Sequence, residues 1–139
     1  MEKIGAIKNG KVITPFRVIE KGIVIYKGKS ISAVGQEDCV KIPREAKVID
    51  ASGKIVAPGF IDIHIHGSKG RDTMDSFYRA INELATFIAT HGTTAFLPTT
   101  ISESHKNLLN AITAVKTAMR KRTNGAEILG LNMEGPYKP

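Results

Sequence analysis

The first fifty residues alternate between apolar and polar positions with a period of two, a pattern that is typical of half-buried β-strands. Asn9 and Gly10 lie between two such alternations, and this dipeptide favours a tight hairpin turn. A second hairpin is predicted around a Lys-Gly-Lys turn at 27–29, and a short strand is predicted at 47–50. Together these elements predict a small antiparallel β domain over residues 1–54.

At Ile55 the pattern changes to strands that alternate with helices. Residues 55–66 are apolar on both faces, as in a strand that is buried in a parallel sheet. In 76–90 the apolar residues recur three and four positions apart, which predicts an amphipathic helix that ends near Gly92. This change of period marks the start of a second structural region.

A strand, a helix and a further strand follow. The first strand is predicted at 94–97, and the last at 126–135. Ser102 and Ser104 are both candidate N-caps of the helix between them. Strands that alternate with helices favour a parallel sheet with right-handed crossovers. Residues 55–139 are therefore expected to form about three βα units of an α/β fold.

Composition narrows the class of protein. The chain of 139 residues is 42% hydrophobic and 24% charged, as in an ordinary globular domain. No apolar run approaches the roughly 20 residues that span a bilayer, and no signal-peptide layout opens the sequence. Cys39 is the single cysteine, which fits a reducing cytoplasm. The net charge of +7 is scattered apart from Arg-Lys-Arg at 120–122, so neither nucleic acid nor a membrane is an expected partner.

Two histidines interrupt the apolar strand at its carboxyl end. Side chains alternate along a strand, so His64 and His66 point to the same side, about 6.5 to 7 Å apart along the backbone. Two imidazoles in register can each offer one ring nitrogen to a cation. The alternative is two independently hydrogen-bonded histidines. Because sites in parallel βα folds form at the carboxyl ends of strands, we favour metal binding.

Glu134 stands at the end of the last predicted strand and brings a carboxylate to the same edge of the sheet. It is positioned to reach a cation held by His64 and His66, and the alternative is a solvated loop glutamate. Three protein ligands leave an open coordination position, which is typical of a catalytic metal site. Imidazoles with a carboxylate suit Zn²⁺, Fe²⁺, Co²⁺ or Mn²⁺.

Four polar residues near these strand ends are expected to form hydrogen bonds that orient ligands or loops. Asp62 shares the histidine face and is expected to hydrogen-bond an imidazole N–H or a backbone turn. Asn132 shares the face of Glu134 and is expected either to orient a ligand or to bond a neighbouring strand's loop. Thr99 and Thr100 are expected to cap or orient loops, with substrate contact as the alternative.

The motif "APGFIDIHIHG" at 57–67 resembles the signature of the amidohydrolase superfamily, in which a metal-binding His-x-His ends the first barrel strand. "HGTTAFLPTT" and "GLNMEGPY" narrow the resemblance to deacetylases of N-acetylated hexosamine 6-phosphates, in which a strand-end Glu-Gly-Pro carries the principal metal ligand. The resemblance implies the amino-terminal part of a (β/α)8 TIM barrel, preceded by a β-sandwich-like domain made from both chain ends. It implies Glu134 as the primary ligand and His64 and His66 as ligands of a second ion, hence one or two divalent ions.

The same resemblance implies a cytoplasmic hydrolase, homo-oligomeric at full length, that converts N-acetylglucosamine 6-phosphate to glucosamine 6-phosphate and acetate. Its expected partner is a small amino-sugar phosphate. Three alternatives stay open: an N-acetylgalactosamine-6-phosphate deacetylase, a cyclic-amide hydrolase, and a non-catalytic assembly fragment whose histidines are structural.

The length departs from the family pattern. A complete barrel typically needs about 250 residues, so the chain is expected to be an amino-terminal fragment. The catalytic aspartate, further metal histidines and phosphate contacts are expected beyond Pro139, so no catalytic or substrate-binding residue is assigned within it. An unfinished sheet leaves unpaired edge groups, and we expect the fragment to be inactive alone and to self-associate.

Overall fold

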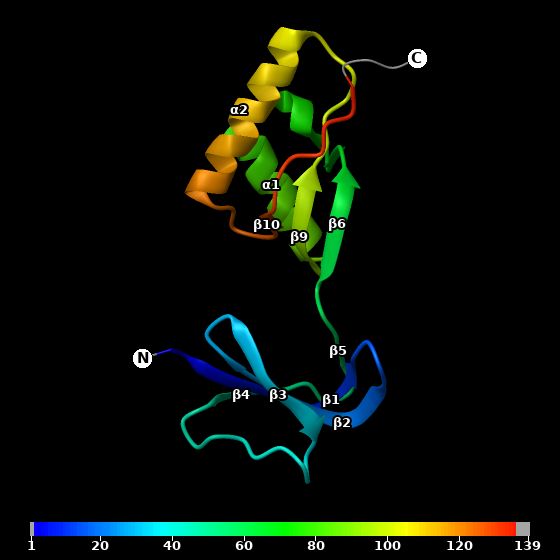
Figure 1. Ribbon diagram of the computed structural model, residues 1–139, viewed down its shortest axis with the longest axis vertical. Helices are drawn as coiled ribbons and strands as arrows, with labels where there is room; N and C mark the ends of the chain where they lie inside the picture. The colour runs from blue at the N-terminus through cyan, green and yellow to red at the C-terminus, as the bar shows by residue number, and fades with distance from the viewer. Residues whose placement is uncertain (1, 136–139) are drawn as a thin grey trace. The chain divides into compact units, whose positions relative to one another are not determined.

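The computed structural model describes residues 2–135, which divide into two compact units between Pro58 and Gly59 (Figure 1). The sequence placed the boundary earlier, between Lys54 and Ile55. The difference arises because β5 (Ile55–Val56) pairs with the first strand of the chain and so remains part of the first unit.

The first unit is one sheet in the order β3-β2-β1-β4, with β5 also paired to β1. Its other strands are β1 (Ile4–Ile13), β2 (Val18–Lys27), β3 (Ser30–Gln36) and β4 (Lys47–Asp50). The predicted hairpin around 27–29 is confirmed, since β2 and β3 pair antiparallel. The prediction of an entirely antiparallel region is wrong, because the connection after β3 returns the chain to run parallel to β1 in both β4 and β5.

Asn9 and Gly10 do not form the predicted hairpin turn but lie inside β1. Asn9 has a φ of 65°, and the pairing of β1 with β2 shifts register between Ile7 and Gly10, which marks a β-bulge. The true turn is closed by Thr14, whose Oγ1 donates to the Arg17 carbonyl at 2.8 Å and accepts from its N–H at 3.0 Å. A residue with positive φ suits a bulge as well as a hairpin turn, so the dipeptide alone did not separate the two.

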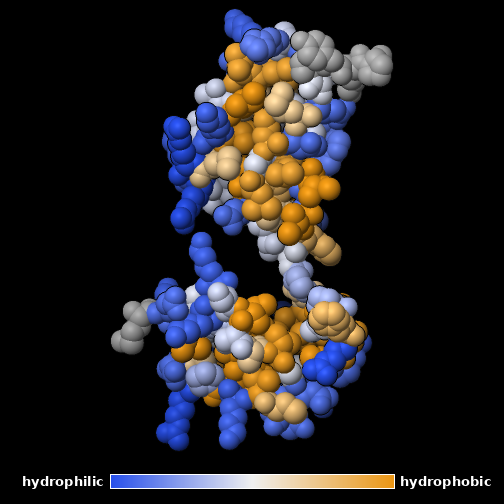
Figure 2. All heavy atoms as spheres, viewed as in Figure 1, coloured by the Kyte–Doolittle hydropathy of each residue, from blue (hydrophilic) through white to orange (hydrophobic). Residues whose placement is uncertain are grey.

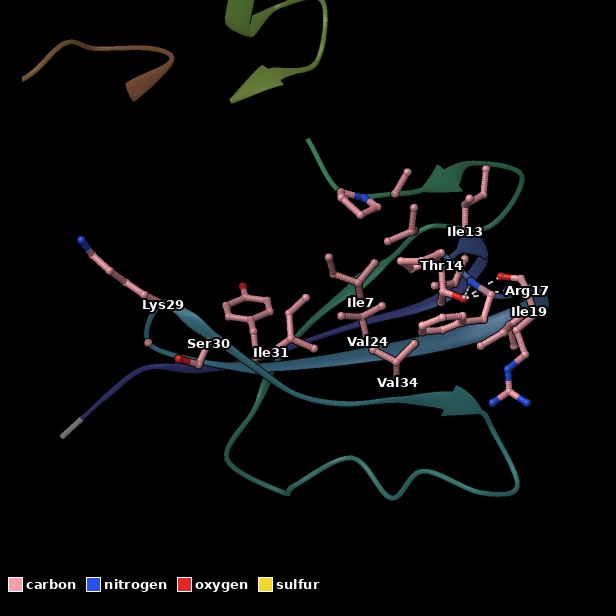
Figure 3. Close-up of a pocket in the computed structure, with 18 residues that line it drawn as sticks. Ile7, Ile13, Thr14, Arg17, Ile19, Val24, Lys29, Ser30, Ile31 and Val34 are labelled. Carbon is pink, nitrogen blue, oxygen red and sulfur yellow. Dashed lines mark hydrogen bonds between the residues drawn. The ribbon is translucent and has the colours of Figure 1, made fainter. Parts of the chain in front are cut away.

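Both faces of this sheet are apolar. On one face Ala6, Ile23 and Ile25 are buried beneath Val40 and Ile42 of the segment that follows β3. The other face is an open hollow of about 820 Å³. Figure 3 shows its floor, formed by Ile7, Val24 and Val34, with Lys29 and Arg17 pointing away at its two ends. Apolar residues on both faces explain why residues 23–26 of β2 form an uninterrupted apolar run.

Asp50, at the end of β4, fixes the turn after that strand. Its Oδ1 accepts hydrogen bonds from Ser52 Oγ at 2.7 Å, Ser52 N at 2.9 Å and Asn9 Nδ2 at 3.0 Å. The bonds from Ser52 and Asn9 lower the pKa of Asp50 from 3.8 to about 2, because they stabilise the charged carboxylate.

We expect an NMR titration of the Asp50 carboxyl carbon to give a midpoint near the pKa of about 2. Because this folded-state pKa is depressed, the ionised carboxylate stabilises the fold above its ordinary pKa, and that stability is lost as the pH falls from 3.8 toward 2. Asn9→Ala removes one donor and should raise the midpoint. An unchanged midpoint in Asn9→Ala would contradict this account of the turn.

The second unit is a three-stranded parallel sheet in the order β10-β9-β6, with two helices (Figure 1). Its elements are β6 (Phe60–Ile65), β7 (Gly67–Ser68), β8 (Arg71–Asp72), a 3₁₀ turn (Thr73–Asp75), α1 (Tyr78–Ala89), β9 (Thr93–Pro98), α2 (His105–Lys121) and β10 (Glu127–Ile128). The predicted order of alternating parallel strands and helices is confirmed. Ser104, not Ser102, caps α2, since its Oγ accepts from the N–H of Asn107 at 3.3 Å.

One hydrophobic core holds this unit together. Both helices contribute to it with strands β9 and β10, through Ile81, Leu84, Phe96, Val115 and Ile128. The predicted apolar face of α1 is therefore buried, whereas in α2 Met119 is 43% exposed and Ala111, Ala114 and Ala118 share the buried face with Leu108 and Val115. Neither helix of the described chain combines the length and the hydropathy that a bilayer-spanning helix needs.

Two details of the sheet differ from the prediction. Ile61 and Ile63 of β6 are 61% and 67% exposed, so β6 is not buried on both faces within residues 2–135. Figure 2 shows apolar side chains gathered along the strands of this unit. The last strand is also shorter than predicted, because after β10 the chain rejoins the sheet only at an isolated bridge between Thr99 and Asn132.

Candidate metal centre

Strand β6 delivers two imidazoles to one point. His64 and His66 project from the same side, as the alternation of a strand predicts. Their Nε2 atoms lie 3.2 Å apart, and the rings meet edge to face with centroids 5.1 Å apart. The Nδ1 atom of His66 is buried and has no hydrogen-bond partner among the described residues, so Nε2 is the nitrogen that faces the cluster.

Glu134 completes the cluster from the segment that follows β10, which β9 separates from β6 in the sheet, so its strand is not the immediate neighbour that the sequence suggested. Its Oε2 lies 3.4 Å from His64 Nε2 and 3.3 Å from His66 Nε2. Within residues 2–135 these three side chains are the group that offers ligand atoms at a spacing suited to a metal ion. The sequence thus identified the three residues that the fold brings together, although their role as ligands is still a proposal.

The spacing of these three atoms fits a divalent ion. Four ligands placed tetrahedrally about 2.0–2.1 Å from zinc lie about 3.3–3.4 Å from one another. The three measured separations, 3.2, 3.3 and 3.4 Å, match three edges of such a tetrahedron. The side chain of His64 is 55% exposed and that of Glu134 is 31% exposed, so the fourth position is open to a small molecule. Such an open position is typical of a catalytic metal site.

Asp62 contacts the backbone of His64, and Asn132 contacts the side chain of Thr99 at the end of β9. Asp62 Oδ1 accepts the backbone N–H of His64 at 3.1 Å, which corresponds to the backbone alternative for this residue. Asn132 Nδ2 donates to Thr99 Oγ1 at 3.3 Å, which corresponds to the alternative of a bond to a neighbouring strand's loop. Both residues therefore act on the strand ends that carry the cluster.

A glycine follows each half of the cluster. A Cβ on Gly67 would lie 2.0 Å from the Arg71 carbonyl oxygen, where the tight β7–β8 hairpin passes. Gly135 has a φ of 95°, and a Cβ there would lie 2.4 Å from Ser102 Oγ. Other residue types are excluded at both positions by sterics, and Gly135 also needs the left-handed conformation that glycine adopts freely. This explains why His-x-His and Glu are both followed by glycine.

Thr73 is the neighbour of the cluster that the sequence did not single out. It is fully buried, and both its N–H and its Oγ1 donate to the His66 carbonyl, at 2.8 and 2.9 Å. No local pattern marks a threonine in a loop as buried, so only the structure could reveal it.

Comparisons with known proteins identify relatives of this chain. The chain is 36% identical over 134 residues to the N-acetylglucosamine-6-phosphate deacetylase of Bacillus subtilis (strain 168), covering 94% of this chain and 34% of the relative. It is 30% identical over 95 residues to the N-acetylgalactosamine-6-phosphate deacetylase of Escherichia coli O157:H7, covering 68% of this chain and 25% of the relative. The chain thus spans about a third or less of the length of these relatives.

The crystal structure of N-acetylglucosamine-6-phosphate deacetylase from Pasteurella multocida superimposes with a TM-score of 0.84 at 26% sequence identity. The match covers 98% of this chain and 35% of that one. A sequence profile described as the amidohydrolase family matches residues 47–121, which include β6, both helices and His-x-His. The chain therefore belongs to the amidohydrolase family.

Proposed function

We propose that this chain carries part of the metal centre of a deacetylase that hydrolyses N-acetylglucosamine 6-phosphate to glucosamine 6-phosphate and acetate. The observation that carries the proposal is the convergence of His64 Nε2, His66 Nε2 and Glu134 Oε2 within one triangle of 3.2–3.4 Å edges. The names of the similar proteins from B. subtilis and P. multocida support the choice of substrate.

The cofactor of this proposal is one or two divalent ions, Zn²⁺, Fe²⁺, Co²⁺ or Mn²⁺. Glu134 serves as the primary ligand, and His64 and His66 add two nitrogens on the same side. A divalent ion bound there would lower the pKa of water and polarise the acetamide carbonyl. Asp62 holds the backbone of His64, and Asn132 ties the chain before Glu134 to the end of β9.

The proposed fold is the amino-terminal part of a (β/α)8 barrel with about three βα units. In the sequence it is preceded by a β-sandwich-like domain. The open apolar hollow on the first unit's sheet supports a second layer contributed by later strands of the chain. Exposed Ile61 and Ile63 on β6 support a further barrel element over that side. Homo-oligomerisation, self-association of the fragment and a cytoplasmic location stay predictions.

The runner-up is an N-acetylgalactosamine-6-phosphate deacetylase, which the similarity to the E. coli O157:H7 protein favours. The two substrates differ only in the configuration at one hydroxyl-bearing carbon, so the metal cluster alone does not discriminate them. A cyclic-amide hydrolase and a non-catalytic fragment with structural histidines remain as further alternatives.

An assay tests this proposal directly. The protein, including any continuation of its reading frame beyond Pro139, is loaded with Zn²⁺ and given both acetylated hexosamine 6-phosphates and a cyclic imide. We expect acetate release fastest from N-acetylglucosamine 6-phosphate. Preference for the galactosamine compound or the imide would replace the proposed substrate. If the protein retains no divalent ion and His64→Ala changes neither stability nor metal content, the non-catalytic alternative holds.

A further inference from the structure

Buried polar side chains are rare in this chain and gather at one place. Among residues 2–135 the buried polar or charged side chains are Thr73, Thr99 and Thr100, and all three are fully buried. A buried hydroxyl is unfavourable unless it is hydrogen-bonded, and valine has nearly the same shape without that requirement. Because valine would fit these three positions, the presence of threonine at each of them indicates that the hydrogen bonds of the hydroxyl groups matter.

Thr99 Oγ1 joins three segments of the second unit. It accepts the backbone N–H of Ile65 at 3.0 Å, donates to the Leu97 carbonyl at 3.2 Å, and accepts from Asn132 Nδ2 at 3.3 Å. These bonds use the one donor and both acceptor positions of a hydroxyl. Ile65 lies between His64 and His66, and Asn132 lies two residues before Glu134. The hydroxyl thus connects the two ligand-bearing strand ends.

The other two threonines each hold one member of the cluster. Thr100 Oγ1 accepts the backbone N–H of Glu134 at 3.2 Å. Thr73 Oγ1 donates to the carbonyl of His66 at 2.9 Å. Backbone hydrogen bonds reinforce the contacts of Thr99 and Thr100. Thr99 N donates to Ile65 O at 2.8 Å, and Thr100 N donates to Asn132 O at 3.0 Å. Apart from the bond of Thr99 to the Leu97 carbonyl, each hydroxyl bond therefore ends on the backbone of a ligand residue or on a residue within two positions of one.

From this placement we infer that Thr73, Thr99 and Thr100 are positioning residues of the metal centre, which set the triangle formed by His64, His66 and Glu134. The inference rests on the proposed function. A metal site tolerates displacements of only about 0.5 Å from its productive geometry. The two strand ends are separate elements of the sheet, so a hydroxyl shared between them keeps the imidazoles and the carboxylate in register.

The test compares Zn²⁺ affinity in matched variants, by competition with a chromogenic chelator at a temperature where circular dichroism shows each protein folded. Thr99→Val should weaken Zn²⁺ binding by about 10- to 100-fold, the usual range for groups that orient metal ligands. Thr99→Ser keeps the hydroxyl and should restore nearly wild-type affinity. Thr113→Val is the control, because the Thr113 hydroxyl bonds only within α2, to Leu109 O at 2.8 Å.

A second pair of variants, at Thr100, keeps the proposal testable if Thr99→Val does not fold. Thr100→Val should weaken Zn²⁺ binding and Thr100→Ser should retain it, with Co²⁺ absorption spectra reporting the altered ligand geometry. If wild type binds Zn²⁺ and both valine variants bind it equally well, the positioning role is overturned while the proposed function stands. If wild type itself takes up no Zn²⁺, the metal centre fails and the positioning role fails with it.

Discussion

Replacing Glu134 with alanine is expected to lower the affinity for Zn²⁺ by about 100-fold or more, since a direct ligand should matter at least as much as the groups that orient it. Its Oε2 is the only carboxylate oxygen of the cluster and lies 3.3–3.4 Å from both Nε2 atoms. Without it, two neutral imidazoles face the cation and no negative charge offsets the ion's desolvation. Isothermal titration with Zn²⁺ measures the loss.

A matched control separates this effect from a general loss of charge. Glu127 is exposed and lies in β10, the strand that precedes Glu134 in the sequence. Glu127→Ala should bind Zn²⁺ as wild type does. His64→Ala and His66→Ala should each weaken Zn²⁺ binding as well, because each removes one nitrogen of the same three-residue cluster. Unchanged Zn²⁺ uptake or undiminished acetate release by Glu134→Ala would remove this residue from the metal centre and, with it, the proposed ligand set.

The convergence of His64, His66 and Glu134 was predictable because each step relies on a regular geometry. Alternation along β6 places His64 and His66 on one side whatever the rest of the fold does. Glu134 required only the inference that the strands of the sheet run parallel, since their carboxyl ends then share an edge even though β9 lies between β6 and β10. The hydroxyl of Thr99 was different, because its partner Ile65 is 34 positions away and nothing in the local pattern links them.

The fold shows the same division between local and non-local information. The two helices and the buried face of α1 followed from periodicity, and the hairpin around 27–29 followed from its turn residues. The bulge at Asn9 was misread, because the positive φ that asparagine tolerates serves a bulge and a turn alike. The parallel pairing of β4 with β1 depends on the path of the long connection after β3, which no short-range pattern specifies.

Replacing Phe96 with alanine is expected to reduce the free energy of unfolding of the second unit by about 3–5 kcal/mol. Phe96 is in the middle strand β9, has no exposed surface, and packs in the core with residues from both helices. Truncation removes the ring from this core and leaves a cavity that the helices, fixed by other contacts, fill only in part. A loss of this size is a large share of the roughly 5–15 kcal/mol that stabilises an ordinary domain.

Urea unfolding followed by circular dichroism measures this loss against a control in the same sheet. Phe60 lies in β6 and is 70% exposed, so Phe60→Ala should change the free energy of unfolding by no more than about 0.5 kcal/mol. Equal losses in the two variants would mean that the helices do not close over β9 in solution. The strand end that carries Thr99 and Thr100 would then lack a fixed support, because it continues directly from the strand that Phe96 anchors.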